Sequence, residues 1–131
     1  MKRFLLACFL LTATCSVTFN YTATAQITPP PAVTLADFTT KIDQLNSLTL
    51  AGNMTAAQAK WLEVHNLMLG VLAVSKYSIY TAPTPTDKAA HESIMVNQRT
   101  IYTTIWGLKT DLATNRVALH TQLVAFGATI Y

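Results

Sequence analysis

The sequence predicts an all-α protein, an antiparallel helical bundle in which four helices are favoured over three helices with a long last one. Apolar residues recur at steps of three and four along most of the chain, and proline or glycine separates these periodic segments. Of the 131 residues, 51% are hydrophobic and 11% are charged, which fits one compact domain. We expect a cleavable signal peptide at residues 1–25, a proline-rich disordered leader at 26–33 and the helical bundle domain at 34–131.

The first 25 residues have the pattern of a secretory signal peptide. Lys2 and Arg3 precede an apolar run at residues 4–11, and residues 23–25 read Ala-Thr-Ala, a small-residue cleavage signal. Both cysteines of the chain lie in this segment, so its removal excludes a disulfide framework and a thiolate site from the mature protein. We expect export, to a periplasm or to the extracellular medium.

The mature chain carries little net charge. Loss of Lys2 and Arg3 from the nine basic side chains leaves seven against six acidic ones, so the net charge falls from +3 to +1. This balance does not provide the basic surface that nucleic-acid binding needs, and we expect no nucleic-acid partner. The longest remaining apolar run, residues 67–74, is too short to cross a bilayer of about 30 Å. We expect no transmembrane segment once the signal is removed.

The prolines at 29–31 and the residues after them predict where the helices begin. Prolines fix three φ angles and remove three donors, so we expect the leader to be extended and to have no role in the core. Thr34, with an aspartate three residues later, begins a first amphipathic helix. Gly52 supplies the left-handed residue that ends this helix after residue 51.

The second and third helices follow from the next capping patterns. Thr55 and Gln58 form a capping box at the start of a second helix that reaches about residue 80. Its apolar residues cover more than one narrow stripe, which predicts a central helix with neighbours on several sides. Thr84 caps a third helix whose first residue is Pro85.

The last 45 or so residues allow either one helix or two. A single helix over residues 86–128 would be about 65 Å long, against about 37 Å for the second helix. Gly107 and the polar residues up to Asp111 favour a break, followed by a fourth helix at 112–126. The helical spacing predicts a core that includes Phe38, Ile42, Leu45, Leu62, Leu69, Leu72, Ile94, Ile101, Ile105, Leu108, Leu112 and Leu119.

The C-terminal segment is the predicted site of contact with another protein chain. Its apolar residues spread wider than one seam of a bundle requires, and few charges lie among them. We therefore expect a protein that acts by protein binding or self-assembly, possibly as a homodimer, and that is not an enzyme. The predicted interface consists of Leu112, Val117, Leu123, Val124, Phe126 and Ile130.

The alternative function is a carrier of a small apolar ligand or haem within the bundle. The antiparallel pairing of the second and third helices places Trp61 and Trp106 within about a turn of each other, as a structural cluster or as a ligand wall. His120 is a possible haem ligand, but the first helix has no methionine and the chain has no Cys-x-x-Cys-His motif. We expect no cofactor.

A few side chains of the sequence have the chemistry of metal ligands or of a general acid or base. The pairs His65 with Met68 and His91 with Met95 each share a helical face, but the two pairs fall about 14 Å apart along the hairpin. Each pair supplies only two ligands, so we expect no metal site. Glu63 is the one carboxylate without an evident structural role, and a solvated position is favoured over a catalytic one.

Overall fold

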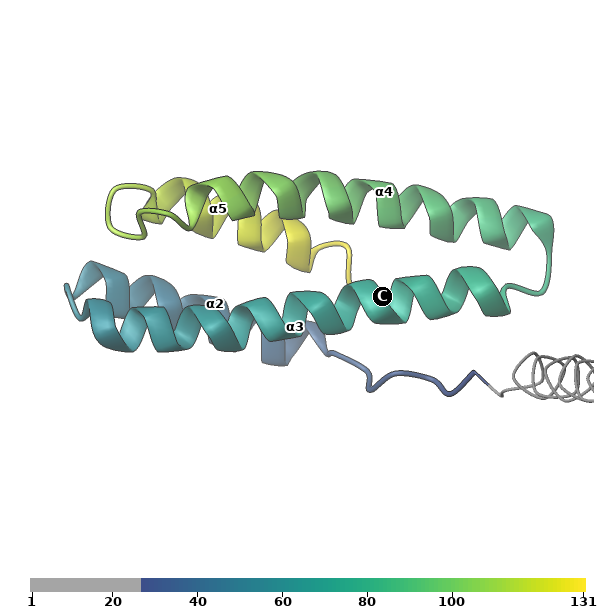
Figure 1. Ribbon diagram of the computed structural model, residues 1–131, viewed down its shortest axis with the longest axis horizontal. Coiled ribbons are helices and arrows are strands. Elements are labelled where there is room, and N and C mark those ends of the chain that lie inside the picture. The colour runs from purple at the N-terminus through teal and green to yellow at the C-terminus, as the bar shows by residue number, and fades with distance from the viewer. Residues whose placement is uncertain (1–26) are drawn as a thin grey trace, which may run out of the picture.

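The computed structural model describes residues 27–131, and over this range the chain forms four α-helices (Figure 1). For residues 27–131 the all-α class and the favoured number of four helices are confirmed. None of these helices is both long enough and apolar enough to span a bilayer. The predicted signal peptide lies outside the described range. The helices are α2 (Leu35–Leu50), α3 (Met54–Thr81), α4 (Pro85–Leu108) and α5 (Arg116–Gly127).

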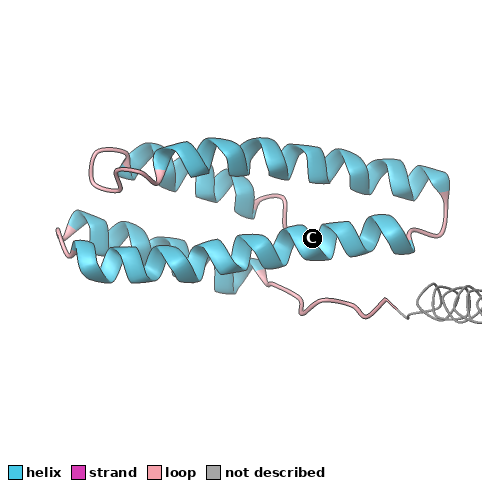
Figure 2. Cartoon of the chain, viewed as in Figure 1, coloured by secondary structure: helices cyan, strands magenta, loops and turns pink. Residues whose placement is uncertain are grey.

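Each helix packs against two others. Helix α2 contacts α3 and α5, and α4 contacts the same two helices, so the four contacts close a ring around the core. Consecutive helices are joined by loops at their ends and run in opposite directions (Figure 2). With 28 and 24 residues, α3 and α4 are longer than α2 and α5, with 16 and 12, and they project beyond them (Figure 1). We call this projecting end, residues 76–95, the tip.

Two helices begin where the sequence predicts. The hydroxyl of Thr34 accepts a hydrogen bond of 3.1 Å from the amide of Asp37, and Thr84 does the same for Asp87. Both threonines satisfy amide groups that the first turn of a helix leaves free. Gly52 has a φ of 74° and ends α2, as expected.

The predicted start of α3 is wrong by two residues. Its N-cap is Asn53, whose side-chain oxygen accepts from the amide of Ala56 at 3.3 Å. Because Gly52 turns the chain just before it, the helix starts at once, at Met54. Thr55 therefore lies inside the first turn and does not cap it.

The core face of α3 is narrower than expected. Its buried side chains repeat at alternating steps of four and three, because the helix packs only against α2 and α4. Leu62 and Leu69, predicted to be in the core, are 60% and 45% exposed. The buried apolar residues of the described chain are Phe38, Ile42, Leu45, Ala57, Trp61, Val64, Met68, Val71, Ile105, Leu112, Leu119, Leu123 and Phe126.

The predicted break after α4 is confirmed, but the last helix starts later than residue 112. Asp111 accepts from the amide of Thr114 at 3.0 Å, and the side chain of Asn115 donates to the carbonyl of Leu108 at 2.9 Å. These bonds hold a loop in which Leu112 is 6% exposed and fills the core without being helical. Helix α5 then has 12 residues, so a long last helix is excluded.

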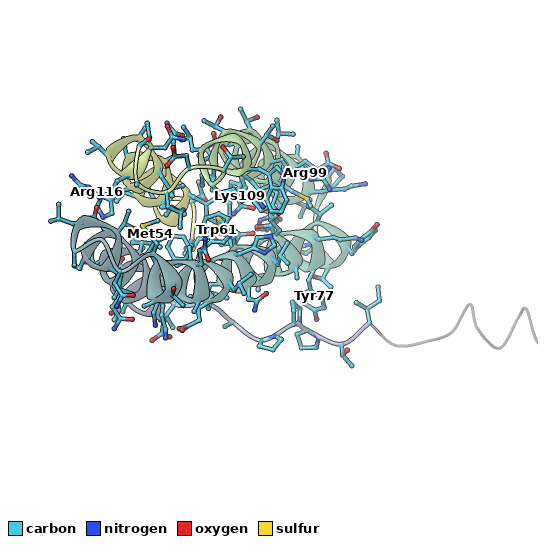
Figure 3. The ribbon with its side chains drawn as sticks, turned by 60° about the vertical axis from the view of Figure 1, so that its left-hand side comes forward. Met54, Trp61, Tyr77, Arg99, Lys109 and Arg116 are labelled. Carbon is cyan, nitrogen blue, oxygen red and sulfur yellow. The ribbon has the colours of Figure 1, made fainter. Side chains whose placement is uncertain are left out.

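The end of the leader packs against the helices. Residues 27–34 contain no helix, and Val33 lies against the hydrophobic core. A Cβ added at Gly70 would come within 2.9 Å of Cγ2 of Val33, so this glycine gives the leader room on α3. Figure 3 shows Tyr77 on the side of α3 that the leader follows. The expectation that the leader has no role in the core is therefore wrong at Val33.

Candidate functional site

Four rings from α3 and α4 form a continuous cluster. The ring of His65 lies 5.9 Å from Trp61, 6.0 Å from Tyr102 and 5.3 Å from Trp106, measured between centroids. The rings of Tyr102 and Trp106 are 6.0 Å apart. These separations fall within the range of favourable aromatic pairs. We call these four residues the aromatic cluster.

Helical spacing and one hydrogen bond hold the aromatic cluster together. Trp61 and His65 are four residues apart on α3, as Tyr102 and Trp106 are on α4, so each pair shares a face. Nε2 of His65 and the hydroxyl of Tyr102 are 2.8 Å apart and share a hydrogen bond between the helices. Nζ of Lys109 lies 3.6 Å from the centroid of the Trp106 ring, a cation–π contact.

The aromatic cluster leads from the core to the surface. Trp61 is 7% exposed, whereas Trp106 is 45% exposed. The sequence placed these two indoles near each other, and the structure brings both onto the ring of His65. Sequence reasoning missed His65 and Tyr102 as members. The signal was present in the four-residue spacing of each pair.

The surface beside the aromatic cluster is apolar along α3. Leu62 and Leu69 lie three residues before and four residues after His65, so they share its side of the helix and are largely exposed. In Figure 3, Arg99 and Arg116 lie on opposite sides of the molecule, with Trp61 and Lys109 between them. We call the following residues the α3–α4 face: Leu62, His65, Leu69, Lys76, Ile79, Tyr80, Lys88, Glu92, Met95, Arg99, Tyr102, Trp106 and Lys109.

Two open clefts lie at the ends of the α3–α4 face. One, of about 390 Å³, is at the tip and is lined by residues of both helices, among them Ile79, Tyr80 and Met95. The other, of about 420 Å³, is bordered by Trp61 and Lys109 together with the start of α3 and the loop after α4. The aromatic cluster borders the second cleft through Trp61 and extends from there along the face.

The space between the helices is much smaller. A cavity of about 10 Å³ lies among core residues of α2 and α5, including Ile42 and Leu119. A second, of about 40 Å³, lies where the leader and the C-terminus meet α3, beside Ser75 and Ile130. Cavities of this size hold one or a few water molecules at most.

The predicted C-terminal interface divides between core and surface. Leu112, Leu123 and Phe126 are at most 6% exposed and belong to the core. Val117 and Val124, seven residues apart on α5, are 64% and 50% exposed. Ile130 is partly buried against the core. Of the six predicted interface residues, the two valines are those that face solvent.

The structure also shows the surroundings of Glu63, His65 and His91, the residues that the sequence offered as acid–base or metal-binding groups. Glu63 lies on the α2 side of α3, where it accepts from Lys41 and Lys60, and the hydrogen bond from Lys41 is the largest cause that lowers its pKa. A general acid needs the opposite shift. Nδ1 of His91 is 3.2 Å from the hydroxyl of Tyr131, far from the aromatic cluster that contains His65. Within residues 27–131 no three His, Cys, Asp or Glu side chains gather as a metal site.

Comparison with known proteins gives no relative from which a function could be carried over. No protein-family model, curated protein or solved structure matches this chain.

Proposed function

We propose that this protein is exported, is not an enzyme, and binds another protein chain through the α3–α4 face. In this proposal residues 1–25 direct export to a periplasm or to the extracellular medium and are then removed. Residues 34–131 act as an antiparallel four-helix bundle. The observation that carries the proposal is the largely exposed apolar and aromatic surface around Trp106, Leu62 and Leu69.

The composition of the α3–α4 face supports a protein partner. The cores of protein–protein interfaces are enriched in aromatic residues, methionine and arginine, and a few buried tryptophan, tyrosine or arginine side chains dominate the binding energy. Trp106, Tyr102, Tyr80, Met95 and Arg99 are residues of these types on one face. Leaving side chains such as Trp106 in water costs burial energy that a partner would recover.

The geometry also supports binding at the surface over enclosure of a ligand. A drug-sized ligand occupies a pocket of about 300–1,000 Å³. The cavity between α2 and α5 is about 10 Å³ and the one beside the leader is about 40 Å³, whereas the open clefts of the α3–α4 face are about 390 and 420 Å³. A third open cleft, of about 720 Å³, lies on α2 and the start of α3, and its lining is mainly polar. Space for a partner is therefore found on the outside of the helices, and the aromatic and apolar side chains favour the α3–α4 face.

Self-assembly remains part of the proposal. Val117 and Val124 give α5 an exposed apolar edge, and residues 117–131 carry no Lys, Arg, Asp or Glu. A second copy of the chain could bury this edge in a homodimer. A partner at the α3–α4 face leaves α5 free for such a contact.

Photo-crosslinking in the native host tests where the partner binds. A photoreactive phenylalanine analogue replaces Leu69 on the α3–α4 face, Val117 on α5, or Thr40, which is exposed on α2. We expect a protein adduct from Leu69 and none from Thr40. An adduct of twice the chain mass identifies self-assembly. Adducts from Val117 alone would place the interface on α5 and contradict the α3–α4 proposal, and no adduct from either position would contradict protein binding.

A second candidate is a carrier of a small apolar ligand or haem. The cleft of about 420 Å³ beside Trp61 is the observation that favours it. Protein recovered from its native host would then show the absorbance of a bound pigment or cofactor. A ligand in the cleft would also quench the fluorescence of Trp61, and the Trp61→Phe variant would lose that part of the response. A colourless protein whose fluorescence is unchanged by apolar dyes would contradict this candidate.

A further inference from the structure

Four basic side chains lie along the α3–α4 face. Lys76, Lys88 and Arg99 line the cleft at the tip. Lys109, at the other end of α4, lies over the exposed ring of Trp106. We call these four residues the basic line. They are four of the seven basic residues outside the predicted signal peptide.

The basic residues elsewhere in the described chain already have partners. Lys41 and Lys60 both pair with Glu63, between α2 and α3. Arg116 donates to the side-chain oxygen of Asn46 at 2.8 Å. These contacts use their hydrogen-bonding groups within the fold.

The basic line is different. Among the residues that the structure describes, no carboxylate lies within 4.0 Å of the charged nitrogens of Lys76, Arg99 or Lys109. Lys88 has one such neighbour, Glu92, at 3.9 Å. The two clefts also contain the carboxylates of Glu92 and Asp111, so the four cations exceed the carboxylates there by two. The α3–α4 face therefore carries an excess of positive charge, although the mature chain is expected to be nearly neutral.

The spacing of the basic line follows the helix. Lys88, Arg99 and Lys109 are eleven and ten residues apart on α4, which corresponds to about 16 and 15 Å along its axis. Eleven residues are close to three full turns, so Lys88 and Arg99 share one side of α4, and Lys109, just past the end of the helix, is turned by about 80° from Arg99. The exposed Leu62 and Leu69 lie on α3 beside this stretch. The face thus combines cations at regular intervals with apolar side chains.

We infer that the α3–α4 face binds an amphipathic helix of the partner protein, with the carboxylates of that helix opposite the basic line and its apolar side chains on Leu62, Leu69 and Trp106. The inference rests on the proposed function and names the chemistry of the partner. A partner helix that lies along α4 has the same rise per residue as α4. Carboxylates spaced ten or eleven residues apart on the partner helix would therefore lie opposite the cations of the basic line. Opposite charges on the two surfaces favour encounter and fix the register.

The same features disfavour a nucleic acid as the occupant. A phosphodiester backbone has closely spaced charges and no apolar side chains to cover leucines, and its binding depends on many cation–phosphate contacts. Four cations separated by apolar residues fit an acidic and apolar helix better. Nucleic acid and anionic lipid are nevertheless included as arms of the test.

The test uses the purified protein and two synthetic helical peptides of 24 residues, the length of α4. One peptide has leucine on one face and glutamate beside it, and its twin has lysine in place of every glutamate. Calorimetric titration at low and physiological salt measures both affinities. We expect the glutamate peptide to bind at least about tenfold more tightly than the lysine peptide, with the difference shrinking as salt rises.

A matched pair of variants assigns the effect to the basic line. The variant Lys76→Gln with Arg99→Gln removes two charges from the α3–α4 face, and Lys41→Gln with Lys60→Gln removes two charges elsewhere. All four side chains reach solvent, and thermal melting by circular dichroism verifies that both variants fold. We expect the first variant to weaken binding of the glutamate peptide about three- to tenfold and the second to change it less than about twofold.

Each remaining outcome overturns the inference in a recognisable way. Equal affinity for the two peptides would show apolar binding without charge selection, which leaves the proposed function intact. Binding of neither peptide, together with an adduct from Leu69 in the host, would mean a partner of other chemistry. Tighter binding of single-stranded DNA or of phosphatidylglycerol vesicles, lost in the Lys76→Gln, Arg99→Gln variant, would assign the basic line to that ligand.

Discussion

The two ends of the molecule differ in how completely they bury apolar side chains. At one end all four helices meet, and we call it the four-helix end; at the other, the tip, only α3 and α4 project. In the four-helix end, Phe38, Met68 and Phe126 are completely buried, and the rings of the two phenylalanines are 5.8 Å apart. In the tip, Ile79 and Ile94 are only partly buried, because a pair of helices can cover each side chain on one side alone. The four-helix end therefore stabilises the fold, and α3 and α4 retain apolar surface for a partner.

The largest effect that separates the two ends is expected for Phe126→Ala. Removing this ring from the four-helix core should lower the free energy of unfolding by about 3–5 kcal/mol, through lost transfer energy and a cavity. Ile79→Ala in the tip should cost about 1 kcal/mol, since the side chain is already partly in water. Urea denaturation followed by circular dichroism measures both. Equal losses would mean that the tip is packed as tightly as the core.

A smaller loss of unfolding free energy is expected for Leu69→Ala. This variant compares an exposed position of α3 with a buried position of the same helix. A core leucine would cost about 2–5 kcal/mol, whereas an exposed position costs within about 0.5 kcal/mol. Leu69 is 45% exposed, so we expect a loss below about 1 kcal/mol. Met68→Ala, one residue away and fully buried, is the control and should show the loss typical of a core position. If Leu69→Ala destabilises as much as Met68→Ala, the burial assigned to α3 is wrong.

The smallest effect concerns pH and the ion pairs between α2 and α3. The hydrogen bonds from Lys41 and Lys60 lower the pKa of Glu63 from its ordinary value of 4.5, so the folded state favours the charged carboxylate. This contribution is complete above pH 4.5 and is lost as the pH falls through the lowered pKa. Glu63→Gln should therefore reduce the loss of thermal stability on acidification below pH 4.5. Glu92→Gln, whose carboxylate is 3.9 Å from Lys88, is the matched control in the tip. A steeper acid-side loss in Glu63→Gln than in wild type would contradict this sign.

The sequence predicted much of the fold because local chemistry decides it. Thr34 and Thr84 cap helices through their own hydroxyls, Gly52 adopts its left-handed φ, and the break after Gly107 follows from weak helix propensity. Each of these features depends on residues within a few positions. Two of the starts were wrong for different reasons. Asn53 caps α3 with its side chain and was overlooked beside Thr55. Asn115 precedes α5 without a side-chain cap, and its side chain instead holds the preceding loop to the carbonyl of Leu108.

The sequence could not predict which apolar side chains of α3 are buried. A wide apolar helix predicts several neighbours, but α3 has two, and only tertiary packing determines that Leu62 and Leu69 point to solvent. The candidate site was found in part, through Trp61 and Trp106. His65 was considered only as a metal ligand. The absence of a carboxylate next to Lys76, Arg99 or Lys109 becomes visible only when the described carboxylates, such as Glu63 on the α2 side, are placed.

The four-helix end provides most of the stability of the fold, and α3 and α4 extend from it with much of their surface in solvent. Amide hydrogen exchange of the purified protein, read residue by residue, tests it most directly. We expect the slowest exchange, limited by global unfolding, in the buried stretches around Val64 and Ile105. Amides of the tip, around Ile79 and Glu92, should exchange at least about tenfold faster through local opening. Equal protection of the tip and the four-helix end would contradict the account.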